Sequence, residues 1–172
     1  MPNLTELSSV YSVIVILVYG WTIYWSFWKL PSWLDFLPLS EIGAIYCYLL
    51  ATNFVESLIT LFGVVFVSLL LPEKWFRDVF VSRGSMLSAI ILISIMNFEY
   101  HYNTPADYFN MFPMYFLITL LVACVAVFFA GWIYIIRKVI EIFAENATIF
   151  LYIMLPLSLL SIIVILIRNL IG

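Results

Sequence analysis

IGAIYCYLLATNFVESLITLFGVVFVSLLL, residues Ile42–Leu71, is an apolar stretch of membrane-spanning length whose one charged side chain is Glu56. An α-helix needs about 20 apolar residues to cross the hydrocarbon core of a bilayer, and this stretch exceeds that length. A carboxylate inside such a helix costs roughly 2.5–3.5 kcal/mol on insertion scales. At about 100° per residue, Asn53, Ser57 and Thr60 share the helical face of Glu56. The sequence therefore predicts a membrane helix with a polar stripe.

The composition of the whole chain also favours a membrane location. Of its 172 residues, 66% are hydrophobic and 10% are charged, whereas a soluble domain carries about 25% charged residues. A water-soluble fold of this composition would have too little polar surface to cover its core. We expect residues 1–172 to form a single transmembrane domain of the all-α class. We expect no cleaved signal peptide, because the N-terminal region has no basic residues before its first apolar run.

Apolar runs predict a bundle of five transmembrane helices. Residues 31–40 are expected to form a turn or an interfacial loop between the first two helices, and Pro72 is expected to end the second. Pro156 lies near the centre of the last run, where a proline produces a kink. The predicted spans are residues 9–28, 41–71, 84–97 with an extension through Tyr100, 113–136 and 147–167.

The basic residues of the predicted loops indicate an orientation. Cytoplasmic loops carry an excess of lysine and arginine. The loops on the side of the N-terminus contain Lys74, Arg77, Arg83, Arg137 and Lys138, whereas the other side contains Lys29 and Arg168. The N-terminus is therefore predicted inside and the C-terminus outside, in a plasma or inner membrane.

Residues 72–82 are predicted to form a short helix that lies in the membrane interface. Glu73 with Arg77, and Lys74 with Asp78, have the i,i+4 spacing of helical ion pairs. An apolar face opposes these charges, as in interfacial helices. We expect this helix to anchor the chain between two spans, and the alternative is a docking surface for another protein. Its candidate residues are Trp75, Phe76, Arg77 and Phe80.

The partner of Glu56 is the central question that the sequence raises. Every lysine and arginine lies in a predicted loop or at a span boundary, so an internal salt bridge is not expected. The carboxyl group can be protonated, can face a hydrated cavity, or can meet a cation from another chain, an ion or a substrate. The polar stripe can also serve helix packing alone. These alternatives remain open at the level of sequence.

A second candidate site lies in the predicted outer loop, residues 97–112. If this segment is extended, Glu99 and His101 lie on the same face, because side chains of a strand alternate. Asp107 is a further carboxylate nearby. One histidine and two carboxylates are too few and too generic to predict a metal site. A membrane enzyme that acts on lipid through these three residues is the weakest functional alternative.

No catalytic motif occurs in the chain, and no cofactor, metal or nucleic acid is expected as a partner. Cys47 and Cys124 lie in apolar runs, where cysteine acts as a small hydrophobic residue. The leading prediction is a non-catalytic accessory or scaffold subunit of a larger membrane complex, with lipid and another subunit or a second copy as partners. The alternative is a component of a proton- or cation-coupled transporter or channel that uses Glu56.

Overall fold

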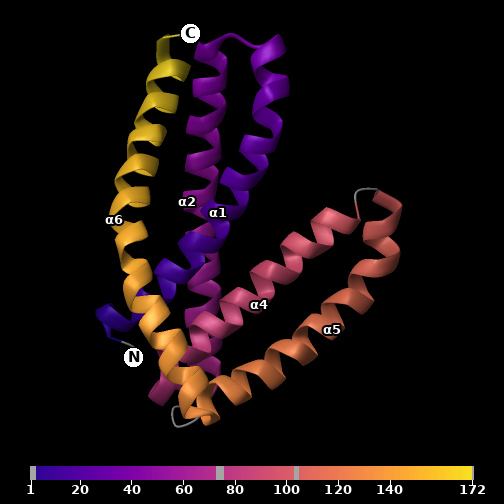
Figure 1. Ribbon diagram of the computed structural model, residues 1–172, viewed down its shortest axis with the longest axis vertical. Coiled ribbons are helices and arrows are strands. Elements are labelled where there is room, and N and C mark those ends of the chain that lie inside the picture. Colours follow the sequence, from indigo (N-terminus) through magenta and orange to yellow (C-terminus); the bar gives the residue numbers. More distant parts are fainter. Residues whose placement is uncertain (1–2, 73–75, 103–104, 172) are drawn as a thin grey trace.

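Five long helices and one short 3₁₀ turn form the part of the chain that the computed structural model describes (Figure 1). This part comprises residues 3–72, 76–102 and 105–171, with the side chains of 105–110 and 171 left out. It contains no strand, and all five long helices are long and apolar enough to cross a membrane, as predicted. The elements are α1 (Leu4–Phe36), α2 (Leu39–Leu70), η1 (Arg77–Val79), α4 (Phe80–His101), α5 (Pro105–Trp132) and α6 (Tyr134–Ile171).

The N-terminal half of α1 is the centre of the bundle. Its side chains from Ser9 to Val15 are all buried, and α1 packs against α2, α4 and α6. Gly84 of α4 makes a close approach possible here: a Cβ at this position would lie 3.2 Å from Val10 and 3.3 Å from Val64. Small residues allow helices in membranes to approach closely and gain dispersion energy. Gly84 therefore lies at the point where α1, α2 and α4 meet.

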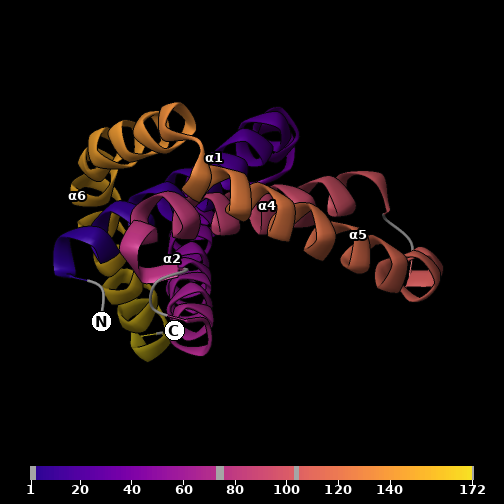
Figure 2. The same cartoon turned by 90° about the horizontal axis from the view of Figure 1, so that it is seen from below.

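Helices α4 and α5 form a hairpin that diverges from the other three long helices. They have 22 and 28 residues, whereas α1, α2 and α6 have 33, 32 and 38. Figure 1 shows the tip of this hairpin well below the α1–α2 connection and the end of α6, and Figure 2 shows the hairpin extending to one side. In Figure 1, α1 begins in the lower part of the view and α6 ends at its top. The hairpin therefore covers only part of the length of α2.

Several helices extend beyond the predicted spans. Residues 31–36 continue α1 through Pro31, so only Leu37 and Pro38 separate α1 from α2. Residues 137–146, predicted as a loop, are helical and belong to α6. Hydropathy marks where a helix leaves lipid, whereas the helix itself ends only where its backbone hydrogen bonds end. Both predicted loops were wrong for this reason.

The predicted extension of the third span is confirmed, because α4 continues to His101. The fourth span ends earlier than the predicted residue 136. Helix α5 ends at Trp132, and Ile133 alone separates it from α6. Ile133 is hydrogen-bonded to both helices, since its amide donates to the carbonyl of Phe129 and its carbonyl accepts from the amide of Arg137. The apolar run therefore contains the junction between two helices.

The helix predicted over residues 72–82 includes residues 73–75, which lie outside the described residues, and it stays a prediction. Phe76 is helical, and its amide donates to the carbonyl of Pro72 at 3.2 Å. Residues 77–79 form the 3₁₀ turn, and Phe80 already begins α4. Trp75 lies outside the described residues. Phe76 and Phe80 are buried in the bundle core, and their rings contact each other edge to face. The predicted apolar face therefore packs against the protein itself, and the side chain of Arg77 donates to the carbonyl of Ser68 on α2.

Candidate functional site

The polar stripe of α2 divides between two neighbouring helices. Asn53 and Ser57 are buried, with exposed fractions of 4% and 0%, and both contact α1. Thr22 donates its hydroxyl to the Asn53 side-chain oxygen at 2.9 Å. The Tyr11 hydroxyl lies 3.1 Å from that of Ser57, which itself donates to a backbone carbonyl, so tyrosine is the donor. This half of the stripe is used in helix packing.

Glu56 and Thr60 form the other half of the stripe and line a groove between α2 and α4. The groove, called the α2–α4 groove below, has a volume of about 610 Å³ and an almost wholly apolar lining. Thr60 donates its hydroxyl to the backbone carbonyl of Glu56, so it does not satisfy the carboxylate. The lining residues from α2 include Thr52 and Gly63, and those from α4 include Ser88 and Ile95. The side chain of Glu56 is exposed in this groove.

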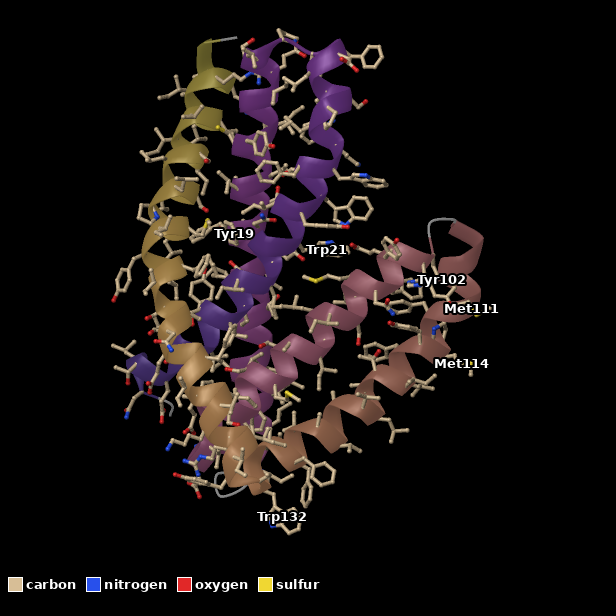
Figure 3. All side chains as sticks on the ribbon, viewed as in Figure 1. Tyr19, Trp21, Tyr102, Met111, Met114 and Trp132 are labelled. Atoms are coloured by element: carbon tan, nitrogen blue, oxygen red, sulfur yellow. The ribbon has the colours of Figure 1, made fainter. Side chains whose placement is uncertain are left out.

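Glu99 of α4 is a second acidic residue beside Glu56. Both carboxylates line one small pocket of about 40 Å³, together with Trp21 and Thr22 of α1. The two acids interact electrostatically. In Figure 3, Trp21 points from α1 into the space that faces the upper half of α4. We call Glu56 and Glu99 the carboxylate pair.

Neither member of the carboxylate pair has a partner for its charge within the described chain. Among the described residues, neither carboxylate accepts a hydrogen bond or forms an ion pair. Arg137, by contrast, forms an ion pair with Glu141 on α6. Apolar surroundings make an uncompensated charge costly. The charged group that lies beside Glu56 is therefore a second acid, Glu99.

The second predicted site does not form as expected. Residues 97–101 belong to α4, so Glu99 and His101 are about 200° apart around the helix axis instead of on one face. The Nδ1 of His101 donates to the backbone carbonyl of Asn97 at 3.0 Å, and its ring contacts Tyr100. The side chain of Asp107 lies outside the described residues. Glu99 belongs with Glu56, and His101 does not.

Arg83 is a further residue that the sequence interpretation misplaced. It was assigned to the loop before Gly84, but it lies inside α4 and is buried, with an exposed fraction of 8%. Its guanidinium lies against Gly131 of α5 and interacts electrostatically with Asp78 and Arg137. Arg83 and Glu99 are about 24 Å apart along α4 at 1.5 Å per residue. This buried cation therefore cannot neutralise the carboxylate pair.

The described residues contain no group of three or more histidine, cysteine, aspartate or glutamate side chains that could hold a metal ion. The carboxylate pair with Thr22 offers oxygen atoms for a proton or a hard cation, or acceptors for a basic side chain. Comparisons of the chain with protein-family models, with curated proteins and with solved structures each found no match.

Proposed function

We propose that this protein is a non-catalytic subunit of a larger membrane assembly and that a transmembrane helix of its partner packs in the α2–α4 groove. In this proposal a basic side chain of the partner lies opposite the carboxylate pair. The observation that carries it is the exposed carboxylate of Glu56 in an apolar groove, beside Glu99 and without a cation from the described chain. Intramembrane acids are retained where they contact a partner, an ion or a substrate.

The position of Glu99 supports a shallow depth for the carboxylate pair. Glu56 is central in α2, but Glu99 is two residues from the end of α4. Trp25 of α1 contacts Tyr100, with ring centroids 6.3 Å apart. Tryptophan and tyrosine favour the membrane–water interface, and the non-helical backbone of Tyr102 at the end of α4 is not tolerated in lipid. We infer that the pair lies about one helical turn below the outer surface, with the N-terminus inside.

At that depth a partner helix can place a cation opposite the carboxylate pair at low energetic cost. A lysine or arginine near the end of a partner helix reaches the interface with its charged group while its stem stays in lipid. Two acids in one place provide acceptors for the several donors of a guanidinium. A second copy in the same orientation offers no match, because the nearest basic residue on this side is Lys29, about two turns above Thr22. A different subunit is therefore favoured over a homo-oligomer.

The shape of the groove suits a helix. A Cβ at Gly63 would contact nothing within 4 Å, so the groove floor is open there. Glycine and threonine on the floor let a partner backbone approach closely. With the hairpin tip at the outer surface, the apolar side chains that α2 and α6 expose above it lie beyond the lipid and need a partner to cover them. A partner helix that packs on α2 would therefore lie on the open side of the bundle.

The test compares two glycines that face open space. Gly63→Leu fills the groove, whereas Gly20→Leu adds the same bulk on α1 outside it. The protein is purified from its native membrane in mild detergent, and co-purifying membrane proteins are identified by mass spectrometry. We expect one stoichiometric partner that is lost with Gly63→Leu and with Glu56→Lys, but kept with Gly20→Leu and Glu145→Gln. Recovery of a homomer alone, or equal capture by both leucine variants, would falsify the proposal.

A second candidate function is proton or cation coupling, and one observation favours it. The pocket of about 40 Å³ shared by Glu56, Glu99 and Thr22 has the size of a single ion or water molecule. This function predicts ion flux in proteoliposomes of the purified chain. Glu56→Gln and Glu99→Gln should each abolish this flux. Flux that is unchanged in both variants, or absent from the native chain, removes this candidate and leaves the subunit proposal intact.

A further inference from the structure

A second groove lies at the opposite end of the hairpin from the carboxylate pair. It has a volume of about 550 Å³ and is formed by α4, α5 and the start of α6. Met86, Ala126, Ala130, Ile133 and Ile136 are among its lining residues, and nearly all of its surface is apolar. We call it the α4–α6 groove. Ala126 and Ala130 have small side chains, and larger side chains at these positions would fill the groove. The groove can therefore hold a flexible hydrocarbon chain.

Basic side chains surround one end of the α4–α6 groove. Arg137 follows the lining residue Ile136 and lies one turn after Ile133, on the same face of α6. Arg83 lies against Gly131, the residue after Ala130, and interacts electrostatically with Arg137. Among the described residues of this end, the acids that interact with these two arginines are Asp78 and Glu141, two acids against four basic side chains. The described basic residues of this end are Arg77, Arg83, Arg137 and Lys138.

Aromatic residues mark the same end as an interface. Trp132 is 74% exposed and Tyr134 is 71% exposed, at the junction of α5 and α6. In Figure 3, Trp132 lies at the lower tip of the molecule and points away from it. Exposed tryptophan and tyrosine favour the headgroup level of a bilayer. The groove therefore runs from the level of the headgroups into the region of the acyl chains.

We propose that the α4–α6 groove binds one phospholipid with an anionic headgroup. Its acyl chain lies along Ile133 and Ala126, and its headgroup phosphate meets Arg137. Arg137 is half-exposed, so its guanidinium can bind phosphate while it also pairs with Glu141. Basic pockets between membrane helices at the cytoplasmic side select anionic headgroups, and each lysine or arginine contributes about 1 kcal/mol. A groove without this charge would accept any lipid equally.

The test measures binding of single lipids to the delipidated protein in detergent by native mass spectrometry. Dioleoyl-phosphatidylglycerol is compared with dioleoyl-phosphatidylcholine, which has the same chains and no net charge. We expect tighter binding of phosphatidylglycerol, with its preference reduced about fivefold by Arg137→Gln. Lys29→Gln, at the other end of the bundle, should leave this preference unchanged. Equal binding of the two lipids by the native chain overturns the proposal.

The role of the groove is tested separately from the role of the charge. Ala126→Phe fills the groove and should weaken binding of both lipids, whereas Leu160→Phe on exposed α6 surface should not. Val122→Phe is a second groove variant at a half-exposed position, for use if Ala126→Phe fails to fold. Glycerol phosphate, which has no acyl chain, should not compete. Competition by glycerol phosphate at lipid concentration, or full binding by both groove variants, would show that the groove has no part.

Discussion

The guanidinium of Arg83 lies directly against Gly131, where α4 meets the end of α5. Any side chain at Gly131 would overlap this guanidinium, whereas a hydrogen leaves room for it. The nearby Ser82 hydroxyl donates to the carbonyl of Ala130 at 2.9 Å, so two neighbouring residues of α4 contact two neighbouring residues of α5. These contacts hold the base of the hairpin together, two residues before the break at Ile133.

Gly131→Ala should therefore destabilise the protein through Arg83. The new methyl group must displace a buried guanidinium, and overpacking of this kind costs about 1–3 kcal/mol. The measurement is the thermal unfolding midpoint in detergent, with Gly20→Ala as the control because its Cβ would meet open space. In an Arg83→Ala background the cost of Gly131→Ala should disappear. A cost that is the same in both backgrounds would place its origin elsewhere.

Two buried serines of α4 provide a matched comparison of hydrogen bonding. Ser82 donates to Ala130 across the helix interface, whereas the Ser85 hydroxyl is buried without a partner among the described residues. Ser82→Ala should lower stability by about 0.6 kcal/mol, the average for such bonds in a membrane bundle. Ser85→Ala should be neutral or stabilising, because it removes an unsatisfied polar group. Unfolding in denaturant measures both, and a larger loss for Ser85→Ala would contradict this assignment.

The number of spans and the face of the polar stripe could be predicted from the sequence because each depends on one helix alone. Apolar length identifies a membrane helix, and the helical period places Asn53, Glu56, Ser57 and Thr60 on one side of it. The assignment of Asn53 and Ser57 to α1, and of Glu56 to α4, depends on how three helices cross. Local sequence carries no signal for that crossing.

The two misplaced charged residues show a second limit. Arg83 and Glu99 lie near the two ends of α4, where hydropathy falls and a loop is the natural interpretation. The backbone nevertheless continues its hydrogen-bonded ladder, so Arg83 is carried into the bundle and Glu99 toward Glu56. The small residues around Arg83, namely Ser82, Gly84 and Ser85, were the one signal of close packing there. Glu99 had no comparable signal.

Tyr19 and Ser158 should be coupled in stability. The tyrosine hydroxyl of α1 lies 2.6 Å from the serine hydroxyl of α6, which itself donates to the carbonyl of Met154. Tyr19→Phe removes the donor and should cost about 0.6–1.7 kcal/mol, the range of such bonds in membrane bundles. Ser158→Ala should add no further loss in that background. Tyr24→Phe, at an exposed tyrosine, is the control, and additive losses from Tyr19→Phe and Ser158→Ala would mean that the bond contributes nothing.

Glu56→Gln should have opposite effects on stability and on assembly. In the purified chain it relieves the repulsion between two carboxylates that lack a cation, so the unfolding midpoint should rise, by about 2–4 °C for each kcal/mol gained. In the assembly it removes the group that faces the partner cation, so capture of the partner should fall. Glu99→Gln should give the same stabilisation, and the double variant should gain less than the sum, because either substitution alone removes the repulsion.

The contrast between these two effects identifies the role of the carboxylate pair. Residues that serve binding commonly cost stability in the free protein, whereas residues that serve packing contribute to it. Glu145→Gln changes an exposed acid of α6 away from the pair and should alter neither quantity. A lower unfolding midpoint for Glu56→Gln would show that its carboxylate already has a stabilising contact within the chain. The whole polar stripe would then serve helix packing, and the proposal that a partner cation lies opposite Glu56 would be wrong.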